Sequence, residues 1–108
     1  MVKGEKEGQR LLKMNRTILD EARAVVYEDR RFRYGQPYSE FCKVAKIWES
    51  ILNITVTAEQ VGLCLVGLKL VRESFKHDKD NLIDICGYCC CIQEIIDNLN
   101  AVDYQEDF

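Results

Sequence analysis

The stretch from Leu82 to Ile92 constrains the fold of this chain more than any other part of the sequence. Nearly every position in it is apolar or small, and Asp84 is its one charged residue. The run belongs to a helix predicted over about 80–99, and a helix that is apolar on all sides must be buried on all sides. We therefore expect other helices to cover it, and a second subunit to cover what they leave exposed.

Three further helices are predicted from apolar residues that recur every three or four positions. The first covers about residues 5–28, the second about 37–53, and the third runs from Thr57 towards Phe75. Thr57 and Gln60 have the spacing of a capping box, which marks the start of the third helix. The sequence therefore contains four predicted helices and no convincing strand.

The predicted fold class is all-α: an antiparallel four-helix bundle that forms a dimer or tetramer through its fourth helix. We expect a single helical domain over residues 1–108, with a core of about 10–99 and a frayed acidic tail over 100–108. The net charge of −3 argues against binding to duplex DNA. The first residues lack an apolar secretion signal, and no run is long enough to span a membrane, so we expect a cytoplasmic protein without a membrane partner.

The six cysteines are predicted to pack as small apolar residues. Three of them are consecutive at residues 89–91, which disfavours a disulfide framework. Cys86 and Cys89 have the spacing of a zinc-binding pair, but they lie inside an apolar helical run without a second such pair. We therefore expect neither disulfides nor zinc.

Two carboxylates lie one helical turn apart near the start of the fourth helix. Asp80 and Asp84 share one face, which His77 joins if the helix begins early. Such a pair either binds Mg²⁺ together with substrate phosphates or has structural roles, with Asp80 as helix cap and Asp84 in a buried ion pair. The sequence leaves both interpretations open.

The third helix carries Lys69, Arg72 and Lys76 on one face. In an antiparallel hairpin, Lys69 and Arg72 approach Asp84 and Tyr88. In structural terms this is a salt bridge between helices, and in functional terms it is a pocket of mixed charge that suits a phosphorylated ligand.

The segment DRRFRYGQPY interleaves arginines with aromatic residues between the first two helices. Arg30 and Arg33 are suited to phosphate contacts, Tyr34 to stacking on a base, and Gly35 to a close approach of the backbone. Pro37 begins a helix whose free N–H groups favour anions. The alternative is a solvated basic connector.

Two segments of the chain carry a spaced set of residues, DR…YG-P…F…W followed by LK..R and H.DN..D..GY. Over residues 17–91 the chain resembles a family of small all-helical proteins from bacteriophages and prophages. The resemblance implies a protein of the infected bacterial cytoplasm, in a family without an assigned activity.

A more distant similarity is to the MazG-type all-α nucleoside triphosphate pyrophosphatases. The resemblance implies two carboxylate motifs, ExxE and ExxD, that hold Mg²⁺ and the nucleotide. This chain departs from both motifs, because Lys43 and Asn81 stand where carboxylates are expected.

The predicted function is binding of a nucleotide or cyclic nucleotide without catalysis, as a sponge that sequesters a nucleotide immune signal of the host. Arg and Lys neutralise phosphate without a metal, so no cofactor is expected. The alternatives are a diverged Mg²⁺-dependent pyrophosphatase, with Asp80 and Asp84 as metal ligands, and a protein-interaction module that uses the acidic tail. The predicted ligand-binding residues are Arg30, Arg33, Tyr34, Gly35, Lys69, Arg72, His77, Asp80, Asn81, Asp84 and Tyr88.

Overall fold

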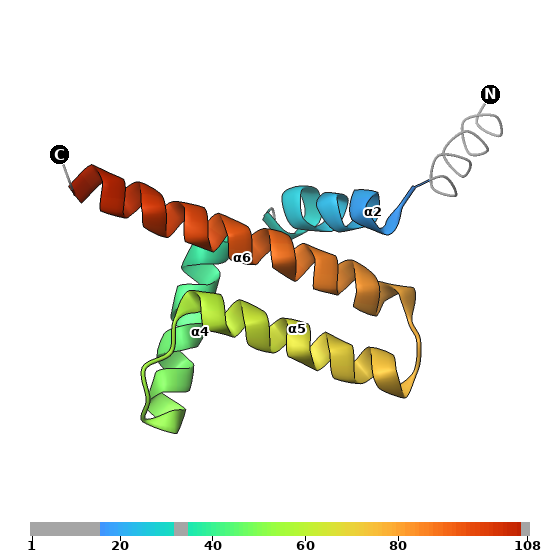
Figure 1. Cartoon of the computed structure of the whole chain (residues 1–108), viewed down its shortest axis with the longest axis horizontal. Helices are drawn as coiled ribbons and strands as arrows, with labels where there is room; N and C mark the ends of the chain where they lie inside the picture. Colours follow the sequence, from blue (N-terminus) through green and yellow to red (C-terminus); the bar gives the residue numbers. More distant parts are fainter. Residues whose placement is uncertain (1–15, 32–34, 107–108) are drawn as a thin grey trace.

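Helices make up all the regular secondary structure in residues 16–31 and 35–106, the part of the chain that the computed structural model describes (Figure 1). The elements are α2 (Ile18–Ala24), the π-helical segment η1 (Val25–Arg30), α4 (Pro37–Leu52), α5 (Ala58–Phe75) and α6 (Lys79–Glu106). Since α2 continues directly into η1, this part of the chain contains four helices and no strand, which confirms the all-α class. None of the described helices is long and apolar enough to cross a membrane.

α6 lies at the centre of the arrangement. α5 packs antiparallel along one side of α6, and α2 packs along the other side (Figure 1). α4 crosses α5 and α6 instead of lying along them. The α5–α6 hairpin agrees with the predicted antiparallel pairing, whereas α4 crosses this hairpin and so departs from the predicted antiparallel bundle (Figure 1).

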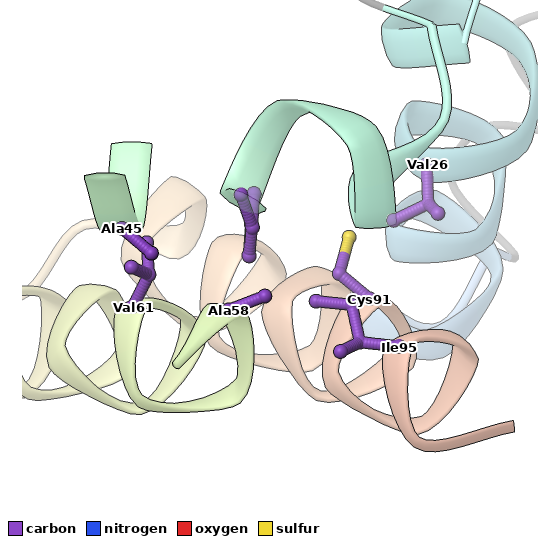
Figure 2. Close-up of a cluster of buried hydrophobic side chains, with 7 residues drawn as sticks. Val26, Ala45, Ala58, Val61, Cys91 and Ile95 are labelled. Atoms are coloured by element: carbon purple, nitrogen blue, oxygen red, sulfur yellow. The ribbon is translucent and has the colours of Figure 1, made fainter. Parts of the chain in front are cut away.

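The core lies where α4 crosses the α5–α6 hairpin and where η1 meets α6 (Figure 2). Its largest buried side chains are each less than 2% exposed: Phe41, Ile95, Val26, Val61 and Cys91. All four helices contribute to this cluster, so the hydrophobic effect holds them together as one unit.

A local cap sets the start of α2. The Thr17 hydroxyl accepts a hydrogen bond from the Asp20 N–H (3.2 Å), and the Asp20 carboxylate accepts one from the Thr17 N–H (3.0 Å). The helix therefore begins at Ile18. The prediction of one helix over 5–28 missed this start, because apolar spacing continues through the cap; residues 5–15 lie outside the described part of the chain.

The other predicted helix limits agree more closely with the structure. Thr57 and Gln60 form the predicted capping box, and Pro37 occupies the first position of α4. α6 is longer than expected, since it continues to Glu106 instead of ending near residue 99. The acidic tail is therefore helical over 100–106.

Arg30 and Arg31, which were predicted to lie in a loop, belong to the end of a helix. The helix continues through Arg30 to Arg31, whose carbonyl accepts a hydrogen bond from the N–H of Gly35 (3.1 Å). Gly35 has a φ of +79°, as its place before α4 predicts. π-helical turns such as η1 are rare and are frequent at functional sites.

The exposed apolar side chains lie mainly on α5 and α4. α6 buries Ile83, Cys91 and Ile95, and its one exposed large apolar residue among those described is Leu99, at 39%. Phe75 of α5 is 91% exposed by contrast. The apolar run of the fourth helix is thus covered largely within one chain, because neighbours occupy both of its sides.

Candidate functional site

A pocket of about 450 Å³ lies between α2, η1 and the start of α6. Such a volume is in the range of small-molecule sites, roughly 300–1,000 Å³. Four of the lining residues carry carboxylates and one carries a guanidinium group. This acidic pocket is lined by Arg16, Glu21, Ala24, Val25, Asp29, Asp80, Ile83 and Asp84.

Helical spacing brings the four carboxylates together. Glu21 and Asp29 lie eight residues apart along the continuous helix of α2 and η1, and Asp80 and Asp84 lie four apart on α6. Because α2 packs against α6, these two acidic faces meet at one pocket. Val25 lies between Glu21 and Asp29 and contributes an apolar part of the wall.

Two of the four carboxylates have ion-pair partners. The Nζ of Lys79 lies 2.9 Å from Glu21, and the Nζ of Lys69 lies 2.7 Å from Asp84. The Lys69–Asp84 contact confirms the predicted salt bridge across the helical hairpin. These two pairs also connect α2 to α6 and α5 to α6, so they stabilise the packing around the pocket.

The other two carboxylates of the pocket, Asp29 and Asp80, form no ion pair within the described residues. Arg16 is the cation among the lining residues. The pocket therefore offers oxygen ligands of negative charge on both of its walls. Chemically, such an arrangement suits a cation, or an anion that carries a cation with it.

Arg30 and Tyr88 lie beside the acidic pocket and contact each other. The guanidinium of Arg30 is 3.0 Å from Glu40 and 5.7 Å from the centre of the Tyr88 ring. The small cavity that Arg30, Tyr88 and Asp84 help to line has a volume of about 10 Å³, enough for about one water molecule. Both side chains are thus engaged in packing η1 against α4 and α6.

Polar groups of the turn between α5 and α6 gather around Glu73. Its carboxylate accepts hydrogen bonds from the N–H of Asp78 (3.0 Å) and from the Asn81 amide (3.3 Å), and it contacts His77. The backbone N–H of Asp78, followed by His77, lowers the pKa of Glu73. Asn81 is buried, so the predicted ligand residues His77 and Asn81 are used here to fix the turn.

The remaining predicted ligand residues do not line the acidic pocket. Gly35 precedes α4, and Arg72 is exposed on α5 without an ion pair within the described residues. Arg33 and Tyr34 lie outside the part of the chain that the structure describes. Of the predicted set, Asp80 and Asp84 line the pocket, and Lys69 reaches it through Asp84.

The six cysteines are free thiols. In residues 16–31 and 35–106, no group of three or more Cys, His, Asp or Glu residues is placed to hold a metal ion. Cys91 is 1% exposed, and burial raises its pKa to about 11. It therefore remains a protonated thiol that packs as a small apolar side chain in the core.

Arg16, Glu21 and Asp29 were not among the residues predicted from the sequence. A signal for two of them is present, because Glu21 and Asp29 have the spacing of two helical turns. The signal requires the helix to continue through Asp29, and the sequence analysis ended that helix at residue 28. The π-helical segment η1 extends it.

The fold and the pocket together define a small all-helical protein with a carboxylate-lined pocket beside its central helix. The chain belongs to the family described as "Domain of unknown function (DUF6378)", whose model matches residues 17–96. It is similar to the "Gene 55 protein" of Mycobacterium phage D29, with 25% identity over 83 residues, which cover 76% of this chain and 55% of the phage protein.

The chain thus spans about half the length of this phage relative. No solved structure matches it. These findings support the predicted membership of an uncharacterised family of phage proteins.

Proposed function

We propose that the protein binds the phosphate groups of a nucleotide in the acidic pocket through a divalent cation such as Mg²⁺. One observation carries the proposal: Asp29 of η1 and Asp80 of α6 line the same pocket, and neither has an ion pair within the described residues. Phosphates and carboxylates repel each other directly, and a divalent cation between them replaces the repulsion by attraction to both.

The residues of the pocket fit Mg²⁺ bound in this way. Mg²⁺ is usually held by one or two carboxylates, several waters and the phosphates of the substrate. Within the described residues no three side chains are placed to hold an ion alone, so Asp29 and Asp80 would share it with phosphate and water. The ion would supply positive charge to the phosphates, and the two aspartates would set its position.

Basic residues around the pocket are available for the phosphate oxygens. Arg16 lines the pocket, while Lys69 and Lys79 contact two of its carboxylates. A bound phosphate adds charge-assisted hydrogen bonds to these cations. Lys69 was already predicted from the sequence as a phosphate-binding residue, and the proposal adds Arg16 and Lys79 to it.

Binding without turnover is the role that we propose first. A phage protein that binds a nucleotide stoichiometrically lowers its free concentration, and a cyclic-nucleotide signal of host defence is one such target. Family membership and the phage relative support the phage setting. The negative charge of the pocket supports binding through a cation, whereas nucleotide binding without a cofactor was predicted from the sequence.

A second candidate is Mg²⁺-dependent hydrolysis of a nucleoside triphosphate, as in the MazG-type enzymes that the sequence distantly resembles. The carboxylate motifs of those enzymes are incomplete in this sequence, because Lys43 and Asn81 stand where carboxylates are expected. One observation favours hydrolysis: Glu21 and Asp29 bring the number of lining carboxylates to four, although no three of them are placed to hold one ion together within the described residues. Metal-assisted hydrolysis needs such groups to hold metal ions and to orient water.

A thermal-shift screen tests the proposal. Nucleoside mono-, di- and triphosphates and cyclic nucleotides are compared in Mg²⁺ and in EDTA. We expect a nucleotide to stabilise the wild-type protein in the presence of Mg²⁺ and not in EDTA. This stabilisation should be lost in Asp80→Asn. It should remain in Asp97→Asn, the control, which makes the same substitution on α6 outside the acidic pocket.

Equal stabilisation in EDTA, or stabilisation that survives Asp80→Asn, would contradict cation-dependent binding. Pyrophosphate release by wild type separates the two candidates. Its appearance establishes the hydrolase, and stabilisation without release establishes the binder.

A further inference from the structure

One side of α5 is an apolar surface without a charged side chain. Leu63 and Leu70 are each 55% exposed, Val71 is 67% exposed and Phe75 is 91% exposed. The charged residues Lys69 and Glu73 turn instead towards α6 and its turn. The α5 face consists of Gln60, Leu63, Cys64, Gly67, Leu68, Leu70, Val71, Ser74 and Phe75.

The C-terminal end of α4 adds to the exposed apolar area. It projects beyond α5 on the side that faces away from α6 (Figure 1). The large apolar residues of both regions, 44–91% exposed, are Ile47, Ile51, Leu52, Ile54, Leu63, Leu68, Leu70, Val71 and Phe75. Together they expose on the order of 900 Å², of which the five on α5 supply on the order of 500 Å². The largest contiguous patch of a monomer is roughly 300–600 Å², and a standard interface buries about 800 Å² per partner.

The positions of the α5 face are symmetric about Gly67 except for Leu68 and Phe75, whose mirrored positions are Val66 and Glu59. Three and four positions away on either side stand apolar residues, Cys64 and Leu63 before it and Leu70 and Val71 after it. Gly67 also lies at the middle of α5, Ala58–Phe75. A two-fold interface pairs each residue with its mirrored counterpart on the other copy, so this face is complementary to itself in an antiparallel pair of helices.

Within the described part of the chain, no contact requires glycine at position 67. A Cβ added there meets nothing within 4 Å, and Gly67 is not among the glycines with positive φ. At Gly62, by contrast, a Cβ would lie 2.5 Å from Cγ1 of Ile92. Glycine weakens a helix interior. At position 67 the absence of a side chain would allow a second helix to approach closely.

We propose that two copies of the chain pair antiparallel through the α5 face, with the two-fold axis at Gly67. α2 lies on the opposite side of α6, so the pairing leaves the acidic pocket open (Figure 1). The predicted homo-oligomer is thus built on α5 instead of the fourth helix.

Sedimentation at micromolar concentration tests the pairing. Wild type should have twice the chain mass of 12.6 kDa. Leu70→Glu places a charge on the α5 face and should sediment as a monomer with an unchanged helical CD spectrum. Leu19→Glu is the matched control, because Leu19 is 69% exposed on α2, and it should remain a dimer. A monomeric wild type, or a dimer that survives Leu70→Glu, overturns the proposal.

Cross-linking tests the position of the axis. Leu70→Cys places its thiol beside the native Cys64 of the other copy, because both positions lie three residues from Gly67, and it should give a covalent dimer on mild oxidation, above the level from the native cysteines. Ser74→Cys is the control on the same face, with its two copies about 20 Å apart along the helix axes. Equal cross-linking by both variants, or none by Leu70→Cys, contradicts an axis at Gly67.

Discussion

At the scale of single residues, the structure separates charged groups that hold the fold from charged groups that face the acidic pocket. Arg30 and Asn81, both predicted to contact a ligand, are engaged by Glu40 and Glu73. Asp29 was not predicted and lines the pocket. The sequence could not make this distinction, because a charged residue on a helix has the same periodicity whether its partner is protein or ligand.

The hydrogen bonds to Glu73 predict an acid-sensitive turn between α5 and α6. The pKa of Glu73 lies below its ordinary value of 4.5 in the folded state, chiefly because of the Asp78 N–H and His77. Its contribution to stability is therefore fully present above about pH 4.5 and is lost as the pH falls through the lowered folded value. Melting temperature followed by CD from neutral pH downwards should fall less steeply in Glu73→Gln than in wild type.

Glu59→Gln is the matched control for this pH dependence, since Glu59 lies in the first turn of the same helix, at the opposite end from the turn to α6. It should follow the wild-type profile. A wild-type profile in Glu73→Gln as well would show that the turn does not account for the acid sensitivity.

The burial of Cys91 predicts a stability difference between neighbouring cysteines. Cys91→Ser places a hydroxyl in the core and should lower the free energy of unfolding by about 1–3 kcal/mol. Cys89 is exposed on the same helix, so Cys89→Ser should change it by less than about 0.5 kcal/mol. Urea unfolding of both variants measures the difference, and equal losses would contradict the core assignment.

At the scale of helices, local signals predicted the elements better than their arrangement. The capping box at Thr57 and the proline at position 37 were sufficient to predict two helix starts. The start at Ile18 and the extension through η1 were missed, because apolar spacing is insensitive to a cap or a change of helix type. The crossing of α4 over the hairpin depends on side-chain packing between distant residues, which periodicity does not contain.

The close contact of α5 with α6 predicts opposite effects at two glycines of one helix. Gly62→Ala forces a methyl group against Ile92 and should cost about 1–3 kcal/mol of unfolding free energy. Gly67→Ala meets open space within the chain and should add up to about 1 kcal/mol.

Both glycine variants are measured by urea unfolding in the Leu70→Glu background, where the proposed pairing is removed. Destabilisation of similar size at both positions would contradict the packing described for α5.

At the scale of the whole molecule, the position of each helix decides which apolar surface remains exposed. Subunit contacts were predicted on the fourth helix because its run from Leu82 to Ile92 is apolar on all sides. α6 is instead the central helix, with α2 and α5 on either side (Figure 1). α5 is an outer helix with an apolar outward face. Only the tertiary arrangement shows that α6 is covered and that α5 is exposed.

The central claim, cation-dependent nucleotide binding in the acidic pocket, is tested most directly by calorimetric titration. The nucleotide that stabilises wild type best is titrated in Mg²⁺ and in EDTA into wild type, Asp29→Asn, Asp80→Asn and Asp97→Asn. We predict that wild type binds the nucleotide in Mg²⁺ and not in EDTA. The affinity in Mg²⁺ should fall about ten- to a hundred-fold in Asp29→Asn and Asp80→Asn, which is a loss of roughly 1.4–2.8 kcal/mol of binding free energy. The affinity of Asp97→Asn should equal that of wild type. Wild-type affinity in both Asp29→Asn and Asp80→Asn would contradict it.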